Sequence, residues 1–510
     1  DHVAIQLNDT HPSIAIPELM RIFVDEEGLE WNEAWGISTR VFAYTNHTVL
    51  PEALERWSVD LMGRLLPRHM EIIYEINDLF LANVKKQFPD DTDLLRRISF
   101  IEENDHKQIR MPYLSIVGSH TINGVAALHT ELLKTTVFKD FYKLFPKRFQ
   151  NKTNGITPRL WLRNANPELS ELIIGKIGNG WITELDQLRK LERYADDPDF
   201  QDSWRKVKRK KKEQLANWLK QTSGIIINPE WLFDVQIKRI HEYKRQLLNI
   251  LHVVFLYNKM LDHPELPFVP RTILLGGKAA PGYHMAKLII NLANDVARVV
   301  NNDPAMRDRL KVVFVPNYNV SIAEKMIPAT DISQHISTAG TEASGTGNMK
   351  FILNGALILG TMDGANIEIA EEVGAENIFT FGMSSDEVSS LAKSGYNPRV
   401  PYQNNPGLRE ALSMINTGYF NRDKPHLYNN LYNSLVFEDK YMLLEDFTSY
   451  VECQQRVMKT WEDQEKWTRM SILNTAASGK FSSDRTIDEY ARDIWKLEPV
   501  TVELQGKKVR

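Results

Sequence analysis

The amino-acid sequence predicts an α/β protein in which the second half of the chain forms a parallel, doubly wound sheet. Two observations lead to this prediction. Beyond residue 225, short apolar runs alternate with segments of helix length. In residues 1–150, apolar residues instead recur with the period of a helix, which indicates mixed but strongly helical structure. The 510 residues suffice for two or three domains.

The first 150 residues contain one long amphipathic helix and two strand signals. Residues 1–7 show a strand-like alternation. From residue 70 onward, apolar residues recur at i, i+3, i+7 and i+11: Ile73, Ile76, Phe80 and Val84. This spacing marks one face of a helix. Residues 115–126 are expected to begin as a strand and then to turn into a helix.

The amino-acid composition changes before the second half of the chain begins. A cluster of turn formers at residues 151–158 suggests a domain boundary. Beyond it we expect strands at 272–277, 310–316, 356–361 and 377–381, with helices over 282–300 and from 321 onward. Near the end, Thr486 and Glu489 form the pattern of a capping box that opens a helix through Trp495. A terminal helix of this kind can pack back onto an earlier domain.

Composition and charge argue against several classes of protein. The formal net charge is −4, which is unlike a protein built for nucleic acid or an anionic membrane. No apolar run approaches the roughly 18 residues of a membrane span. The single cysteine, Cys453, fits a reducing compartment, and we expect a cytoplasmic protein. The chain has no initiator Met and opens in a strand pattern, as if cut within a domain.

The most informative stretch for chemistry is residues 338–351. Gly345 and Gly347 lead into an apolar-periodic segment, and a glycine turn at a helix start exposes free N–H groups that suit a phosphate. The stretch matches neither the P-loop nor the dinucleotide pattern. Lys350 lies among small residues, so it could lose its proton and form a Schiff base with an aldehyde cofactor. Glycine turns also precede helices that bind nothing, so both interpretations stay open.

Two basic segments allow a functional and a structural interpretation. In residues 236–245, a helix would place Lys238, His241 and Arg245 on one face, where they could hold more than one phosphate. A solvated basic helix is the simpler alternative. The denser run over residues 205–212 is expected to be the solvated face of a polar helix rather than a nucleic-acid site. His11 and His47 lack a second ligand at metal spacing, so no zinc site is expected.

Seven motifs, in the same order, resemble the α-glucan phosphorylases, most closely the animal glycogen phosphorylases. The motifs are distributed over the whole chain. With the first residue of each numbered, they are Gln6-Leu-Asn-Asp-Thr-His-Pro, Thr45-Asn-His-Thr-Val-Leu-Pro, Gln150-Asn-Lys-Thr-Asn-Gly-Ile-Thr-Pro, Gln236-Ile-Lys-Arg-Ile-His-Glu-Tyr-Lys, Gly276-Gly-Lys-Ala-Ala-Pro-Gly, Glu342-Ala-Ser-Gly-Thr-Gly-Asn-Met-Lys and Gly360-Thr-Met-Asp-Gly-Ala-Asn.

The resemblance implies a GT-B architecture, with two Rossmann-like domains that face each other across a cleft. Residues 1–154 would be the carboxyl-terminal part of the first domain, which is therefore incomplete in this chain. Residues 155–510 would form the domain that binds pyridoxal 5'-phosphate. The chain would correspond to roughly the last three fifths of a family member. The full-length protein is expected to be a homodimer.

The resemblance also implies an activity. The family transfers the terminal α-1,4-linked glucosyl unit of glycogen to inorganic phosphate, giving glucose 1-phosphate with retention. The phosphate of pyridoxal phosphate would trade a proton with inorganic phosphate during this reaction. The crowded cations would keep both dianions within reach of that proton. The expected partners are therefore glycogen, inorganic phosphate and glucose 1-phosphate, and neither nucleic acid nor membrane.

Site residues are carried over position by position. Lys350 would hold pyridoxal phosphate, whose phosphate would rest on Gly345, Thr346 and Lys238. Arg239 and Lys244 would hold inorganic phosphate. The glucosyl unit would be bound by His47, Asn154, Tyr243, Glu342, Ser344 and Gly345. The catalytic set would be Lys238, Arg239, Lys244 and His47. Of a separate glycan storage site, this chain would contain four residues: Tyr74, Asn77, Glu103 and Lys107.

Two residues differ from the pattern of the family, and two other functions stay open as alternatives. Asn319 and His335 stand where animal relatives usually carry Arg and Gln, and we expect them to tune the activity rather than abolish it. A nucleotide-sugar glycosyltransferase of the glycogen-synthase kind shares the fold but would lack a lysine placed like Lys350. A non-catalytic glycan-binding remnant is the second alternative. The dinucleotide fingerprint of an NAD-dependent enzyme is missing.

Overall fold

The computed structural model describes residues 3–500, 502–504 and 507–509. It divides into two compact units, which are described one by one. The first unit combines Asp1–Asn154 with Arg485–Arg510, and the second is Gly155–Asp484. The chain thus leaves the first unit after Asn154 and returns to it at Arg485.

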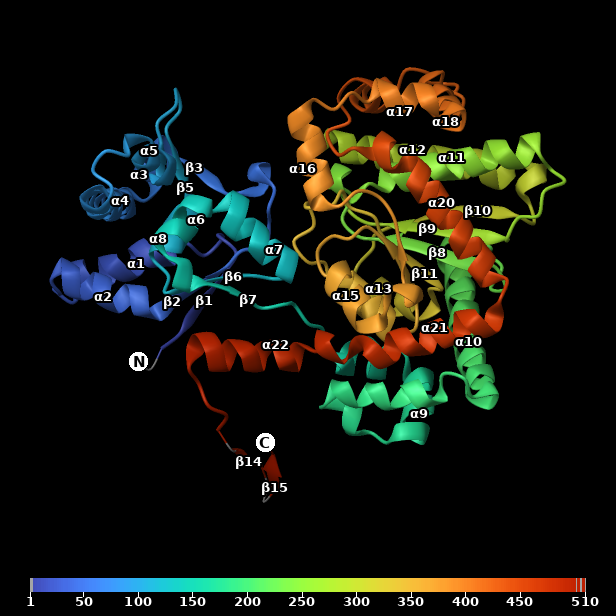
Figure 1. Cartoon of the computed structure of the whole chain (residues 1–510), viewed down its shortest axis with the longest axis horizontal. Helices are drawn as coiled ribbons and strands as arrows, with labels where there is room; N and C mark the ends of the chain where they lie inside the picture. Colours follow the sequence, from blue (N-terminus) through green and yellow to red (C-terminus); the bar gives the residue numbers. More distant parts are fainter. Residues whose placement is uncertain (1–2, 501, 505–506, 510) are drawn as a thin grey trace. The chain divides into compact units, whose positions relative to one another are not determined.

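A parallel sheet forms the centre of the first unit. Its four strands run in the order β1 (Ile5–Asn8), β2 (Phe42–Thr45), β6 (Thr121–Gly124) and β7 (Phe149–Asn151) (Figure 1). Every residue of β2 and β6 is buried, as expected for parallel strands covered on both faces. β1 confirms the strand predicted at the start of the chain, but it begins only at Ile5, and residues 1–2 of the prediction lie outside the described residues.

Helices surround this sheet, and a small antiparallel sheet adds β3 (Arg56–Ser58), β4 (Ile101–Glu102) and β5 (Gln108–Arg110). The helices are α1 (Ala15–Arg21), α2 (Trp31–Val41), α3 (Val59–Leu65), α4 (Pro67–Gln87), α5 (Thr92–Ile98), α6 (Met111–Val117), α7 (Ala127–Leu132) and α8 (Lys139–Leu144). Helix α4 confirms the predicted long helix, because its predicted apolar face is buried. Proline at its first position suits a helix start.

The prediction for residues 115–126 was wrong in its order. Residues up to Val117 belong to helix α6, and the strand β6 comes after it. Pro112 at the start of α6 fixes a helical backbone, and the apolar run that follows is short enough to suit either structure.

Near the end of the chain lies helix α22 (Ser483–Tyr490), which continues as one π-helical turn over Ala491–Trp495. The predicted end at Trp495 is confirmed, but the predicted capping box is wrong. Thr486 lies inside the helix, and its hydroxyl donates to the carbonyl of Thr153 at 3.0 Å. Within the first unit, Tyr490 accepts a 2.8 Å hydrogen bond from Asn123, and Asp493 pairs with Lys152 at 2.9 Å. A hairpin of β14 (Val502–Leu504) and β15 (Lys507–Val509) follows.

The second unit is built on six parallel strands. Their order is β10 (Leu310–Val315), β9 (Arg271–Gly276), β8 (Leu232–Ile237), β11 (Ile332–His335), β12 (Leu357–Gly360) and β13 (Phe379–Thr380). Each strand is joined to the next along the chain by helical segments. The predicted parallel α/β sheet and its four predicted strands are therefore confirmed. Strands β8 and β11 were not predicted.

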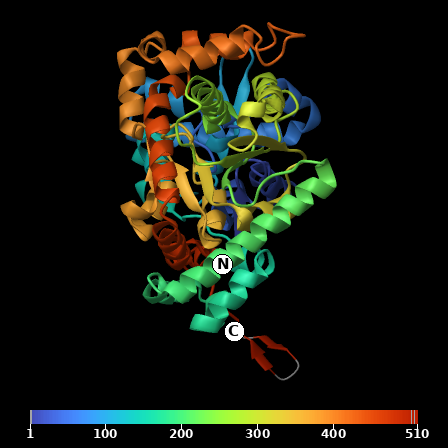
Figure 2. The ribbon, with the colours of Figure 1, turned by 90° about the vertical axis from the view of Figure 1, so that its right-hand side faces the viewer.

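Helices cover both faces of this sheet (Figures 1 and 2). The helices of the unit are α9 (Pro167–Ile177), α10 (Pro198–Ser223), α11 (Gln246–Asp262), α12 (His284–Asn302), α13 (Val320–Ala329), α14 (Gly347–Leu353), α15 (Asn366–Val373), α16 (Ser385–Ser394), α17 (Arg399–Asn404), α18 (Pro406–Asn416), α19 (Asn429–Asn433), α20 (Leu443–Trp461) and α21 (Gln464–Ala476). In β9, Ile273 and Leu275 pack with α11 and α12, whereas Leu274 packs on the opposite face with α10 and α13. This alternation creates two cores and makes the sheet doubly wound.

Among the described residues, no helix combines the length and the apolar character needed to cross a membrane.

Candidate active site

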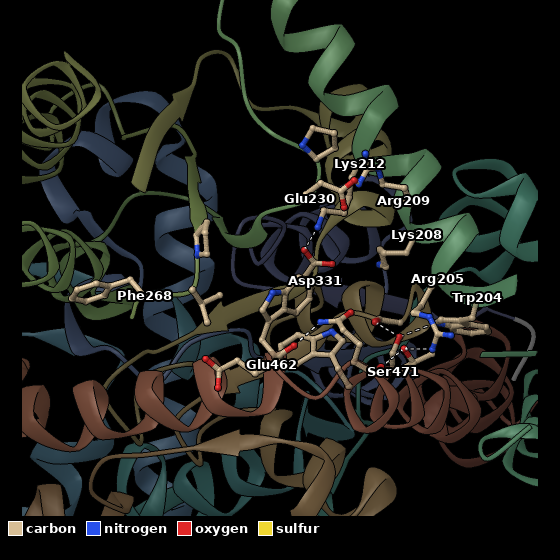
Figure 3. A pocket seen from close by; sticks show the side chains of 18 residues that line it. Trp204, Arg205, Lys208, Arg209, Lys212, Glu230, Phe268, Asp331, Glu462 and Ser471 are labelled. Atoms are coloured by element: carbon tan, nitrogen blue, oxygen red, sulfur yellow. Dashed lines mark hydrogen bonds and ion pairs between the residues drawn. The ribbon is translucent and has the colours of Figure 1, made fainter. Parts of the chain in front are cut away.

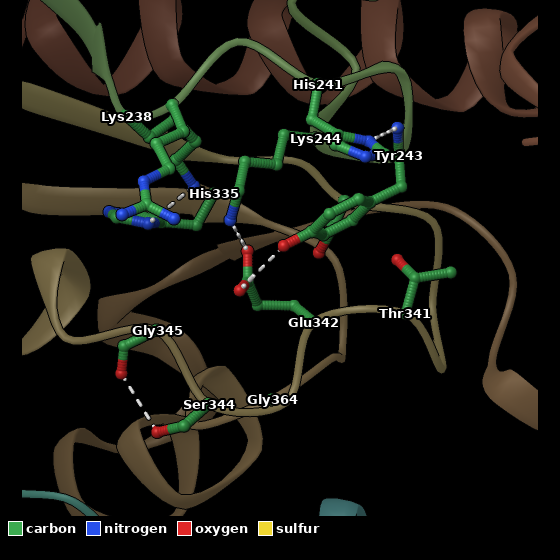
Figure 4. A network of polar contacts seen from close by, with 12 residues as sticks. Lys238, His241, Tyr243, Lys244, His335, Thr341, Glu342, Ser344, Gly345 and Gly364 are labelled. Carbon is green, nitrogen blue, oxygen red and sulfur yellow. Dashed lines mark hydrogen bonds and ion pairs between the residues drawn. The ribbon is translucent and has the colours of Figure 1, made fainter. Parts of the chain in front are cut away.

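The candidate site lies at the carboxyl edge of the six-stranded sheet. The basic segment begins at Lys238, directly after β8, and the glycine-rich segment lies between β11 and α14. In an open parallel α/β sheet, ligands bind at this edge because the strand-to-helix connections meet there. Figure 4 shows Lys238, Lys244, Glu342 and His335 gathered at these connections.

The basic segment is not the helix that the sequence predicted. A loop and a short 3₁₀ helix over Glu242–Lys244 follow β8, and α11 begins only at Gln246. Lys238, His241 and Arg245 therefore do not share a helix face. The loop leaves the sheet beside β9, where a side chain on Gly277 would overlap the carbonyl oxygen of Lys238.

Arg245 has a structural position instead of a place among the phosphate-binding cations. Its side chain is buried and forms an ion pair with Asp446 at 2.7 Å. Its Nε donates to the carbonyl of Ile336 at 2.7 Å, and a further nitrogen donates to the carbonyl of Ser337 at 3.1 Å. Arg245 therefore joins the exit of β11 to helix α20.

Lys244 and Glu342 form the central ion pair of the site, at 2.6 Å. Tyr243 donates to the other carboxylate oxygen of Glu342 at 3.3 Å. Burial alone would raise the pKa of Glu342, but Lys244 and Lys238 outweigh it and hold that pKa below its usual value. Burial and the neighbouring carboxylate raise the pKa of Tyr243 to about 12. At neutral pH the pair is thus a carboxylate facing an ammonium, with a neutral phenol beside them.

Lys238 contacts His335, which is one of the two residues that differ from those usual in the animal phosphorylases. Burial, together with Lys244, lowers the pKa of Lys238 to about 8. Burial and the lysine charge hold the pKa of His335 well below its usual value, so the ring is neutral. Nδ1 of His335 accepts from Nζ of Lys238 at 3.3 Å, and its Nε2–H donates to Ser333 at 2.7 Å. The ring is also close to Gly347, where an added Cβ would lie 3.5 Å from it. His335 therefore places Lys238 beside the start of α14.

Asn319, the other residue that differs from the one usual in the animal phosphorylases, caps a helix. Its Oδ1 accepts from the backbone N–H of Ile322 at 3.1 Å at the start of α13. This bond satisfies one of the free donors at the helix start.

Arg239 is exposed, and within the described part of the chain its guanidinium has no hydrogen-bond or ion-pair partner. It is therefore available to an anion, in contrast to Lys244, which is already paired with Glu342. A guanidinium can contact phosphate through two parallel N–H groups.

The glycine-rich segment turns sharply before α14. Gly345 has a φ of +72°, a conformation that strains other residues. In the described residues, the backbone N–H groups of Gly345 and Thr346 donate to no other part of the chain. Ser344 is buried, and its hydroxyl donates to the carbonyl of Gly345 at 2.9 Å. Helix α14 has only seven residues, so the loop amides contribute more than a helix dipole to an anion site.

Lys350 lies in α14 and is half-buried. Its Nζ is 4.2 Å from the centre of the Trp161 ring. Burial lowers its pKa. Within the residues that the structure describes, no carboxylate forms an ion pair with it. An amine of this kind loses its proton more readily than an exposed lysine, so it fits the attachment of an aldehyde cofactor.

Asp363 was missed by the sequence analysis although it lies within one of the quoted motifs. Its carboxylate accepts from the backbone N–H groups of Gly340 (2.9 Å), Glu342 (2.8 Å) and Gly364 (3.0 Å), and from the Ser337 hydroxyl (2.7 Å). The three bonds from Ser337, Gly340 and Glu342 hold the loop that presents Glu342. An acidic residue in a glycine-containing turn after an apolar run was the available signal.

The remaining predicted residues belong to the first unit. His47 follows β2, is exposed, and its Nε2 lies 2.6 Å from Oδ1 of Asn8 at the end of β1. Asn154 is the last residue before the chain leaves that unit, and its carbonyl accepts from Arg485 at 3.2 Å. Both residues are therefore placed only within the first unit, and the remainder of the set, from Lys238 to Lys350, lies in the second.

The predicted storage-site residues lie on α4 and on the β4–β5 hairpin. Tyr74 is half-buried on α4. Asn77 is buried, and its amide oxygen accepts from the backbone N–H of Phe100 at 2.8 Å. Glu103 and Lys107 form an exposed ion pair at 3.5 Å. The amide oxygen of Asn77 is therefore engaged in holding the chain before the hairpin.

The parallel sheet and the cationic loops at its carboxyl edge define an α/β protein with a candidate site for phosphate groups. The family model described as carbohydrate phosphorylase matches residues 1–497. The chain belongs to the carbohydrate phosphorylase family.

Curated relatives agree with this family. The chain is 56% identical to a glycogen phosphorylase of Synechocystis sp. over 505 residues, which cover 99% of this chain and 60% of the relative. It is 57% identical to the muscle-form glycogen phosphorylase of Bos taurus and 56% identical to that of Homo sapiens, each over 499 residues, 98% of this chain and 59% of the relative. The chain thus spans about three fifths of the length of these relatives.

Proposed function

We propose that this chain acts in the phosphorolysis of glycogen, releasing glucose 1-phosphate from terminal α-1,4-linked glucosyl units with pyridoxal phosphate as cofactor. One observation carries the proposal. Lys238, Arg239 and the loop amides of Gly345 and Thr346 come from neighbouring connections at one sheet edge, and Lys350 follows in α14. Among the described residues, the guanidinium of Arg239 and these amides have no other partner. A reaction between two phosphates needs two such groups of donors.

The residues present fit the cofactor. Lys350 would hold it covalently, and the amides of Gly345 and Thr346 with Lys238 would hold its phosphate. When bound, pyridoxal phosphate supplies a phosphate that can accept and return a proton. The positive charge of Lys238 offsets the repulsion between two phosphate groups that are held close together. This effect is strong because the site is partly shielded from water, and electrostatic attraction is stronger there than in bulk solvent.

Arg239 and Lys244 would hold inorganic phosphate. Arg239 contributes a charge without a competing partner, whereas Lys244 must share its charge with Glu342. Glu342, Tyr243 and Ser344, with His47 and Asn154 of the first unit, would bind the hydroxyl groups of the glucosyl unit. Carboxylate, phenol, hydroxyl and amide groups provide both the donors and the acceptors that sugar hydroxyls require.

Further parts of the proposal rest on the family alone. They are the GT-B architecture, the homodimer, the cytoplasmic location, the storage site at Tyr74, Asn77, Glu103 and Lys107, and the tuning roles of Asn319 and His335. The six-stranded parallel sheet of the second unit supports a Rossmann-like domain.

Phosphorolysis itself tests the proposal. The purified chain, supplied with pyridoxal phosphate, is incubated with glycogen and inorganic phosphate, and glucose 1-phosphate is measured. We expect its formation to depend on both substrates. Glucosyl transfer from a nucleotide sugar would instead support the glycosyltransferase alternative. Glycogen binding by a folded, cofactor-loaded chain without any turnover would support the glycan-binding remnant.

The pKa of Lys238 predicts how phosphate affinity depends on pH. Lys238 is a cation below about pH 8 and loses its charge above it. Its attraction for phosphate is therefore complete well below this pH, and the affinity of the site for inorganic phosphate should fall as the pH rises through about 8. Calorimetric titrations across this range measure the effect. Lys238→Arg should remove the decline, because arginine stays charged to about pH 12 or higher. A decline that persists in this variant would assign it to another group.

A further inference from the structure

A cavity of about 590 Å³ lies in the second unit, away from the candidate active site (Figure 3). Its wall includes Glu230, Pro270 and Asp331, which lie just before β8, β9 and β11. The cavity is thus at the amino edge of the sheet, whereas the candidate active site is at the carboxyl edge. Its size falls within the range of small-molecule sites.

One wall of the cavity is a row of cations on α10. Arg205, Lys208, Arg209 and Lys212 are spaced at i, i+3, i+4 and i+7, so they share a helix face, and all four line the cavity. The prediction that this run is a solvated face is wrong at Lys212, which is buried, but Arg205 and Arg209 stay partly exposed. Lys212 is only 4% exposed. The flanking Lys206 and Lys210 are exposed and lie outside the lining.

Two of these cations are neutralised by carboxylates. Lys212 pairs with the buried Asp331 at 2.6 Å, and Figure 3 shows the two side chains pointing toward each other. Arg209 pairs with Glu213 at 2.8 Å and also with Glu230. These pairs leave little charge to attract a ligand.

Within the described residues, the other two cations have no close carboxylate partner, although the lining also includes the carboxylate of Glu462. Lys208 donates to the carbonyl groups of Pro328, Thr330 and Asn354 at 2.7 to 3.0 Å, and no carboxylate forms an ion pair with it in the described part of the chain. Burial lowers its pKa to about 8. Arg205 has neutral oxygen partners at 3.4 Å, on Gln201 and Thr468, and a carboxylate, that of Asp202, only at the 4.0 Å limit. The guanidinium of Arg205 is therefore loosely held.

Aromatic rings form another part of the lining. The rings of Trp461 and Trp467 lie 4.9 Å apart at 86°, so a face and an edge meet. Trp461 is partly exposed, and within the described residues its indole N–H has no acceptor. Phe268 lies elsewhere in the lining. Flat rings of this kind stack with or pack edge-on against an aromatic ligand.

We propose that this cavity is a binding site for a small anionic aromatic molecule, with its flat ring against Trp461 and its anionic group at Arg205. Charge favours an anion at Arg205, because its closest partners are neutral oxygens and the carboxylate of Asp202 reaches it only at 4.0 Å. Trp461 selects a ring, since its side chain is partly exposed and a small inorganic anion would leave it uncovered, whereas Trp467 is already buried. This site is additional to the proposed phosphorolysis and does not depend on it.

Three probes separate the features of such a ligand. Binding of 1-naphthalenesulfonate, methanesulfonate and 1-naphthol to the full chain is measured by calorimetry. The first carries the ring and the anion, the second only the anion and the third only the ring. We expect 1-naphthalenesulfonate to bind at one site per chain and at least about tenfold more tightly than either partial probe, since both ring and charge contribute.

Variants assign the binding to this cavity. Arg205→Ala and Trp461→Leu should each weaken 1-naphthalenesulfonate binding by about tenfold or more. Arg205→Gln, which keeps a polar chain, provides a second variant that folds if Arg205→Ala does not. Lys210→Ala removes an equal charge from the same helix outside the cavity, where it pairs with Glu168, and should bind like the wild type, as should Arg239→Ala in the candidate active site. Wild-type affinity in the Arg205 and Trp461 variants, or equal binding of methanesulfonate, would overturn the proposal.

Discussion

Replacing Arg239 by Ala is expected to lower kcat/KM for inorganic phosphate by about 10²- to 10³-fold, the range found when one preorganised donor to a developing charge is removed. Arg239 is exposed and has no partner within the described residues, so its charge serves no internal contact. Folding stability should therefore change by no more than about 0.5 kcal/mol. Initial rates of glucose 1-phosphate formation at varied phosphate, together with urea unfolding, measure both quantities.

Two further variants make this result specific. Arg239→Lys should recover part of the activity, because it keeps the charge but loses the two-pronged contact. Lys220→Ala removes an exposed cation at the end of α10 and should leave kcat/KM unchanged. An Arg239→Ala variant with wild-type kcat/KM would remove this residue from the phosphate site.

Replacing Arg245 by Ala is expected to destabilise the second unit by about 3–5 kcal/mol, because it leaves a buried carboxylate without its partner. Arg245 is fully buried and pairs with Asp446 at 2.7 Å. The same guanidinium holds the carbonyl groups that follow β11. A loss of this size is a large share of the roughly 5–15 kcal/mol that stabilise a typical protein. Urea unfolding followed by fluorescence measures it.

The double variant Arg245→Met with Asp446→Leu provides the control. It removes both charges, so its stability loss should be smaller than the sum of the two single losses. A loss below about 1 kcal/mol for Arg245→Ala would mean that the pair is not a buried structural contact, since exposed pairs contribute at most about that much.

The sequence predicted the strands that contain an unbroken apolar run. β9 has Ile-Leu-Leu, β10 has Val-Val-Phe-Val and β12 has Leu-Ile-Leu, and buried parallel strands contain such runs. Strands β8 and β11 were missed because polar residues interrupt them. Gln334 donates to Asp234 at 2.6 Å, and such partners far apart in the chain satisfy the polar groups only after folding.

Position and environment of the basic residues could not be predicted in the same way. Lys238 and Arg245 are seven positions apart, which suits a helix, but β8 runs up to Ile237 and the chain then turns. Arg245 finds Asp446 some two hundred residues later. Likewise, Lys208 is held by carbonyl groups at the ends of α13 and α14. Spacing along one segment carries no information about such distant partners.

The attachment of pyridoxal phosphate to Lys350 tests the central claim most directly. The chain is incubated with pyridoxal phosphate and reduced with borohydride, the absorption is recorded before and after reduction, and the modified residue is identified by peptide mass spectrometry. The account predicts one pyridoxyl group per chain, on Lys350, and none at this position in a folded Lys350→Ala variant. A well-folded wild-type chain that carries no label on Lys350, or a label spread over exposed lysines, would contradict it.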